Sequence, residues 1–194
     1  MTERPSRRDL ICRAAVELAA EGGNHAVTHQ AIDARLGLAR GSTSYYYRTR
    51  AALVSATITH LAERSRTQFL GLVPSEPPRT ARDAAGVIAG YLGALVADRR
   101  TDVLARYAFV SDAVADERLR SELASCLFSV EAARALMDVL AVDDADASAR
   151  DLVSLCEGLV FDLVCGTRSL RDADPRTEVE AAVGGWIRTL VPSR

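Results

Sequence analysis

The chain has 194 residues, of which 48% are hydrophobic and 26% are charged, an ordinary balance for a globular protein. No apolar run approaches the length of a membrane span, and the charged start, MTERPSRRDL, lacks the apolar core of a signal peptide, so we expect a cytoplasmic protein. The formal net charge is −2, but residues 1–54 carry eight arginines and five acidic residues, a net charge of +3. A basic N-terminal part on an acidic body is typical of a protein that binds nucleic acid by that part only.

Apolar residues recur at helical spacing along almost the whole chain, and no strand pattern or internal repeat competes. A glycine pair ends the first predicted helix, and three prolines in the segment 74–79 cannot continue a helix. The sequence therefore predicts an all-α protein of about nine helices. Their predicted ranges are 6–21, 28–36, 40–47, 49–72, 80–98, 102–114, 116–142, 147–170 and 175–191.

The segment from Thr28 to Leu53 is the most informative part of the chain. Thr28 is placed to cap a short helix, because its hydroxyl can accept a hydrogen bond from a free backbone N–H. Gly37 supplies the left-handed conformation that ends this helix. Residues 40–47 form a second short helix that is dense in hydroxyl groups and aromatic rings. Two short helices joined by a glycine turn predict a DNA-binding helix-turn-helix.

Over residues 7–54 the chain resembles the TetR family of bacterial transcriptional repressors. The resemblance is specific because the turn glycine, the aromatic run and the basic residue agree in spacing. The residues that match the family motif are Thr28, Ile32, Leu36, Gly37, Leu38, Ala39, Arg40, Gly41, Tyr45, Tyr46, Tyr47, Arg50 and Leu53.

Four positions that differ from the motif bear on the DNA-binding interpretation. Ala39 stands where the family often has serine, so the third helix loses a usual cap worth about 1 kcal/mol. Ser44 stands where many members have tyrosine, Tyr47 replaces phenylalanine, and Arg50 replaces lysine with the charge kept. None of these changes removes the DNA-binding interpretation.

The resemblance implies an N-terminal three-helix domain with the helix-turn-helix, at residues 1–50, and a C-terminal helical domain for ligand binding and dimerisation, at residues 51–194. It implies a homodimeric repressor that binds a palindromic operator in double-stranded DNA. A small-molecule effector would release the repressor from this inverted repeat. No enzymatic activity, cofactor, metal or membrane partner is expected.

The third helix is expected to enter the major groove. The predicted base contacts are Arg40, Ser42, Thr43 and Tyr45, and the predicted phosphate contacts are Thr28, Tyr46 and Arg50. Arginine suits guanine, whereas serine and threonine can read either a donor or an acceptor. Two alternatives remain open: Thr43 packs inward, and Arg40 touches only phosphate. Tyr47 is expected in the core, where the family places a phenylalanine ring.

The C-terminal helices carry the predicted dimer-interface residues and the predicted ligand-binding residues. The helix at 147–170 is apolar almost all round, which predicts burial on more than one side. The predicted dimer interface comprises Leu155, Gly158, Leu159, Val183 and Trp186, with a single chain's own core as the alternative. The predicted ligand-binding residues are Tyr91, Tyr107, Phe128 and Phe161, with ordinary core packing as the alternative. The lack of an obvious buried charge predicts a largely apolar or neutral ligand.

The sequence alone leaves two competing functions open. The first is a thiol-based redox-sensing regulator in which Cys126 or Cys156 is the switch, although buried, reduced thiols are the expected state of the cysteines. The second is a helical enzyme or small-molecule-binding protein without DNA binding. No arrangement of nucleophile and base, metal cluster or phosphate loop in the sequence favours it.

Overall fold

The computed structural model describes residues 5–72, 74, 76–172 and 174–191. The first four residues of the charged N-terminal segment, and Ser75 in the predicted proline-rich break, lie outside the described residues. The described part contains eleven α-helices and two short 3-10 helices, and no strand, so the all-α prediction is confirmed. The helices form two compact units, Met1–Thr67 with Thr101–Leu127 and Gln68–Arg100 with Phe128–Arg194. None of the described helices has both the length and the apolar character that crossing a bilayer requires.

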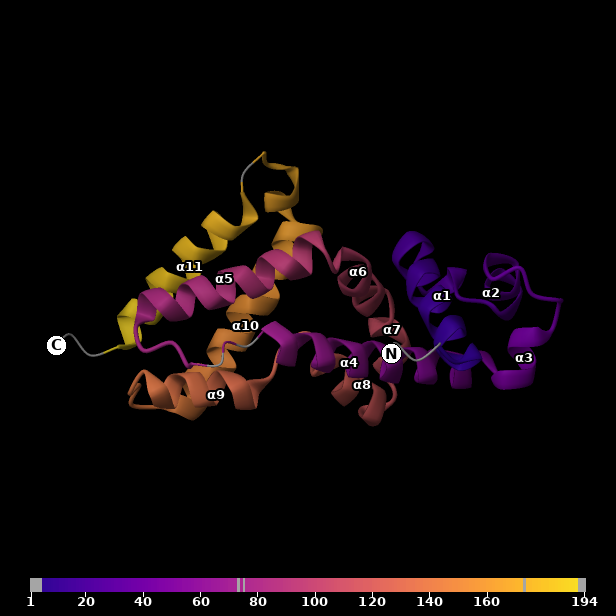
Figure 1. The fold of residues 1–194 in the computed structure, drawn as a ribbon, viewed down its shortest axis with the longest axis horizontal. Coiled ribbons are helices and arrows are strands. Elements are labelled where there is room, and N and C mark those ends of the chain that lie inside the picture. Colours follow the sequence, from indigo (N-terminus) through magenta and orange to yellow (C-terminus); the bar gives the residue numbers. More distant parts are fainter. Residues whose placement is uncertain (1–4, 73, 75, 173, 192–194) are drawn as a thin grey trace. The chain divides into compact units, whose positions relative to one another are not determined.

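The first unit contains the predicted helix-turn-helix (Figure 1). Its elements are α1 (Arg7–Gly22), η1 (Asn24–Ala26), α2 (His29–Arg35), α3 (Ser42–Tyr46), most of α4 (Arg50–Leu72) and of α6 (Arg100–Ala108), α7 (Val110–Ala113) and α8 (Glu117–Ala124). Its core contains fully buried side chains that include Ile11, Ile32, Leu53 and Ile58. Ser6 and Asp9 start α1 with reciprocal side-chain caps, and the Thr28 hydroxyl caps α2 as predicted.

The second unit holds the remaining helices. They are α5 (Ala81–Ala97), α9 (Val130–Val139), α10 (Ala145–Val164), η2 (Thr167–Leu170) and α11 (Pro175–Leu190). The α5 helix packs along α11, and α10 packs against α9 (Figure 1). A Cβ added at Gly184 would lie 3.2 Å from the Ala85 Cβ, so this glycine permits the close approach of α11 to α5 within one chain.

Two long predicted helices are divided in the structure. The segment 102–114 contains most of α6 and all of α7, and the segment 116–142 contains α8 and α9 with a break at 125–129. The break occurs because the Ser129 hydroxyl accepts a hydrogen bond from the Ala132 N–H and so starts a new helix. The apolar spacing did not reveal it, because the residues inside the break are themselves buried; they are Cys126, Leu127 and Phe128.

The grouping of helices differs from a single division at residue 50. Helices α7 and α8 and most of α6 belong to the same unit as the helix-turn-helix, although they follow it by some fifty residues in sequence.

Candidate functional site

The short helix α3 is started by a side chain from another helix. Its first turn follows Gly41, which has a φ of 92° and provides no side-chain cap. The Asp33 carboxylate of α2 supplies the cap: one oxygen accepts from the Gly41 N–H at 2.8 Å and the other from the Thr43 N–H at 2.8 Å. The Thr43 hydroxyl also donates to Asp33, at 2.7 Å. These three hydrogen bonds fix α3 to α2, and thus fix the helix that is expected to read DNA.

Asp33 is buried, with 3% of its surface exposed. Burial alone would raise its pKa, but the hydrogen bonds from Thr43 and Gly41 favour the charged form and lower the pKa overall. The carboxylate is therefore ionised at neutral pH. Sequence reasoning missed this residue. The available signal was the family motif, in which alanine follows the isoleucine that Ile32 matches, whereas this chain has an aspartate at that position.

Thr43 does not face outward. Its side chain is fully buried and its hydroxyl bonds Asp33, so the structure contradicts the predicted base contact and agrees with inward packing. Tyr47 is also buried, as predicted for the core, and its hydroxyl lies 3.6 Å from the Cys12 sulfur. Burial raises the pKa of Tyr47 to about 12, so the phenol stays neutral.

Other predicted DNA contacts lie at the surface of the first unit. Tyr45 is 84% exposed, and its ring meets the Tyr46 ring edge to face at 5.3 Å. Ser42, Tyr45 and Tyr46 line a small surface hollow with Leu38 and with Arg7 of α1. Two further residues of the predicted set, Thr28 and Arg40, are also exposed. A basic side chain beside hydroxyl groups suits a backbone phosphate, so Arg7 is a further candidate for contact with DNA.

Arg50 already has an anionic partner within the protein. Its guanidinium lies 2.6 Å from a carboxylate oxygen of Asp112 on α7 and donates to the Asn24 carbonyl at 2.8 Å. The Asn24 amide donates in turn to Asp112 and Ser111, at 3.0 and 2.9 Å. This cluster, which we call the Arg50 node, joins the turn after α1, the start of α4 and α7.

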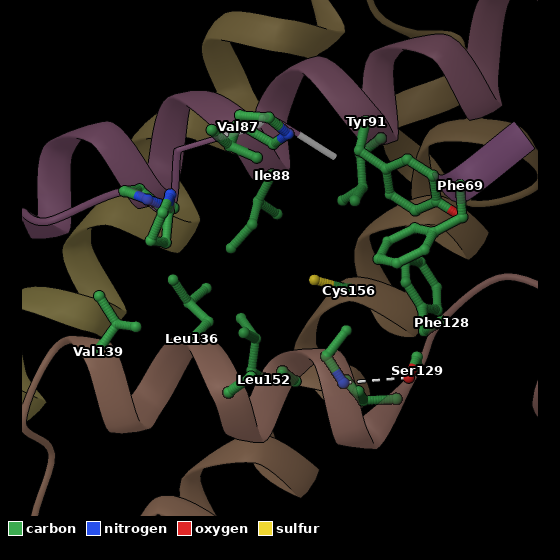
Figure 2. Close-up of a pocket in the computed structure, with 18 of the residues that line it drawn as sticks. Phe69, Val87, Ile88, Tyr91, Phe128, Ser129, Leu136, Val139, Leu152 and Cys156 are labelled. Atoms are coloured by element: carbon green, nitrogen blue, oxygen red, sulfur yellow. Dashed lines mark hydrogen bonds between the residues drawn. The ribbon is translucent and has the colours of Figure 1, made fainter. Parts of the chain in front are cut away.

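The second unit contains a partly open cavity of about 460 Å³ (Figure 2). Residues from the end of α4, the segment after it, α5, α9 and α10 line it. Two of the predicted ligand-binding residues, Tyr91 and Phe128, are among them. Tyr107 belongs to the first unit, and Phe161 is 52% exposed and does not line the cavity. The structure thus brings two of the four predicted residues together.

The predicted dimer residues divide into two groups. Leu159 and Val183 are buried within one chain, so their side chains cannot meet a partner without refolding. Gly158 is exposed, and Leu155 and Trp186 are partly exposed. A Cβ built on Gly158 meets no atom within 4 Å, so a partner helix would find open backbone there.

The proposed redox cysteines lie in unreactive surroundings. Cys126 and Cys156 are both buried, and burial raises the pKa of Cys156 to about 12. A thiol with such a pKa forms almost no thiolate at neutral pH. This observation gives no support to Cys156 as an oxidant sensor.

Two related family models match separate parts of the chain. The family model of bacterial regulatory proteins of the tetR family matches residues 11–57, and that of the tetracyclin repressor-like C-terminal domain matches residues 79–189. No curated protein matches the chain.

Solved structures share the fold over almost the full length. The multidrug binding protein EbrR, complexed with imidazole, is 24% identical over 98% of each chain, with a TM-score of 0.66. A transcriptional regulator from Rhodococcus sp. Rha1 is 17% identical over 95% of this chain and 96% of its own, with a TM-score of 0.76. A TetR family member from Streptomyces coelicolor A3 is 22% identical over 97% of this chain and 100% of its own, with a TM-score of 0.68.

Proposed function

Because the chain belongs to the TetR family of DNA-binding transcriptional regulators, which are not enzymes, we propose that it is a homodimeric repressor released from an inverted-repeat operator by a small molecule. The cavity of the second unit is the observation that carries the ligand-responsive part of this proposal. EbrR, which shares the fold, has been solved with ethidium, proflavin and malachite green, and this supports small-molecule binding by the same kind of domain.

The proposed release requires two states with different affinities. A ligand shifts the protein away from DNA only by binding the DNA-free state more tightly. Linkage then requires operator DNA to weaken ligand binding by the same factor. A molecule that fills the cavity equally well in both states would leave the operator occupied.

The operator part of the proposal requires a twofold dimer, because one α3 reaches few bases. Two copies match an inverted repeat whose half-sites lie about one helical turn apart, ~34 Å. Selection of bound fragments from random duplex DNA tests this directly. We expect selected fragments to share an inverted repeat, whereas recovery of single, unpaired sites would contradict a dimeric repressor.

We predict that Gly158→Arg disrupts the proposed dimer without unfolding the chain. The position is exposed and has free space around it in a single chain, but an arginine there would keep a partner helix away. Sedimentation should show a monomer, and affinity for a two-site operator should fall by about a hundredfold, because the second half-site no longer binds intramolecularly.

Gly71→Arg is the matched control for this prediction. Gly71 is also an exposed helical glycine with free space around it, but it lies on α4 and outside the proposed interface. The control should keep the dimer and the operator affinity. A dimeric Gly158→Arg protein would place the interface elsewhere.

A further inference from the structure

We propose that the cavity of the second unit binds an uncharged organic molecule with a flat aromatic part and an aliphatic part. This inference rests on the proposed effector role of the cavity and specifies the chemical class of its ligand.

Among the described residues, none that carries a charge at neutral pH lines the cavity. The lining residues are Phe69, Leu70, Pro74, Pro77, Pro78, Val87, Ile88, Tyr91, Leu92, Phe128, Ser129, Ala132, Ala133, Ala135, Leu136, Val139, Leu152, Val153 and Cys156, with no Asp, Glu, Arg or His among them. A ligand charge placed here would lose its hydration and gain no counter-charge. The wall therefore disfavours cations and anions alike.

Two polar side chains of the wall, Ser129 and Cys156, offer little to a polar ligand. The Ser129 hydroxyl already accepts the Ala132 N–H at 3.1 Å as the cap of α9. The Cys156 thiol is a weak hydrogen-bonding group, and burial keeps it in the neutral form. A ligand rich in donors and acceptors would leave most of them unsatisfied in this cavity.

The wall has two chemically different ends (Figure 2). Phe69, Tyr91 and Phe128 lie together at one end, with ring-centre distances of 5.3 Å for Phe69–Tyr91 and 6.0 Å for Tyr91–Phe128. Leu136 and Val139 lie at the other end. Edge-to-face clusters accept a further aromatic ring, whereas branched aliphatic side chains pack against alkyl groups.

Size is consistent with a drug-like molecule. The cavity volume of about 460 Å³ falls within the ~300–1,000 Å³ that is usual for such ligands.

A pair of probes of nearly the same shape separates the effect of charge from that of shape. 6-Methylphenanthridine is uncharged at pH 8, whereas 5-methylphenanthridinium has the same rings, the same added methyl group and a permanent positive charge. Calorimetric titration of the full chain should give an affinity for the neutral probe at least about tenfold higher. Equal or tighter binding of the cation, or no binding of either probe, would overturn the proposal.

A variant that places a charge at the cavity wall provides a second test of the proposal. Val139→Glu adds a carboxylate at a lining position of α9 that is 44% exposed, so the protein should still fold. This variant should raise the affinity for the cation and reduce or reverse the preference. Val130→Glu is the control, since Val130 lies on the same helix, is 45% exposed and does not line the cavity.

A third measurement separates this proposal from the effector role. Operator release by the neutral probe is followed in the same samples. Probe binding with the expected preference but without release would leave the ligand class supported and the proposed effector role refuted.

Discussion

Replacing Asp33 with asparagine is expected to lower the free energy of unfolding by about 2 kcal/mol and to weaken binding to all DNA sequences by about tenfold. The carboxylate accepts three hydrogen bonds at the start of α3, from the N–H groups of Gly41 and Thr43 and from the Thr43 hydroxyl. An amide presents one oxygen and one NH₂ group, so a donor would face a donor in a buried site. The loss should be uniform across sequences because Asp33 positions α3 and does not itself read bases.

Urea unfolding and fluorescence anisotropy with labelled duplexes measure the two effects. Asp9→Asn is the matched control: Asp9 also takes part in a helix cap, but its hydrogen bonds are exposed, so its loss should cost less than about 1 kcal/mol. Thr43→Ser should retain most of the affinity because it keeps the hydroxyl. A sequence-dependent loss in the Asp33 variant would show a direct role in base recognition.

Because of Asp33, we also expect the unit that contains the helix-turn-helix to lose stability at acidic pH. The native pKa of Asp33 is lowered relative to an unfolded aspartate, so its contribution to stability is complete above about pH 4 and is lost as the pH falls towards the native value. Below that range the wild-type protein and Asp33→Asn should converge in stability. Unfolding curves recorded from pH 7 to pH 3 check this convergence.

The sequence predicted mainly features that depend on residues close together in the chain. Thr28 and Gly37 act within their own helix and turn, and the structure places both as predicted. The structure begins α3 after Gly41, two residues beyond the cap position expected at Ala39, and the cap that Asp33 provides was not visible in the sequence. Asp33 reaches α3 only after the chain has turned back on itself, and no periodicity encodes that contact.

When a helix is apolar all round, its sequence does not show which face is exposed. In α10 one apolar run contains both Leu159, which is buried, and Phe161, which is 52% exposed, so sequence pattern alone could not distinguish them. The same ambiguity affected the ligand residues: Tyr91 and Phe128 line the cavity, whereas Tyr107 lies in the other unit. An apolar helix face can pack in a core, line a cavity or form an interface. The positions of the neighbouring helices are needed to distinguish these three cases.

Removing the carboxylate of Asp112 is expected to strengthen DNA binding by about tenfold, and only in a protein that retains Arg50. We propose that a DNA phosphate competes with Asp112 for the Arg50 guanidinium, since the resemblance to the TetR family makes Arg50 a phosphate contact and the structure pairs it with Asp112 at 2.6 Å. In Asp112→Asn the guanidinium no longer has to leave an anionic partner before it reaches the phosphate. Arg50→Ala should weaken all sequences about equally and lower the salt slope by about one.

A double-mutant cycle measured by anisotropy at several salt concentrations tests the competition. The gain from Asp112→Asn should vanish in the Arg50→Ala background, because the two residues act through one contact. Glu122→Gln controls for the removal of one negative charge from the same unit, since Glu122 is a partly buried acid that bonds Thr59 and Arg118 and does not contact Arg50. Weaker binding by Asp112→Asn would instead mean that the Arg50 node holds the helix-turn-helix in its binding geometry. The sign of this one substitution therefore decides whether α7 restrains the DNA-binding helices or supports them.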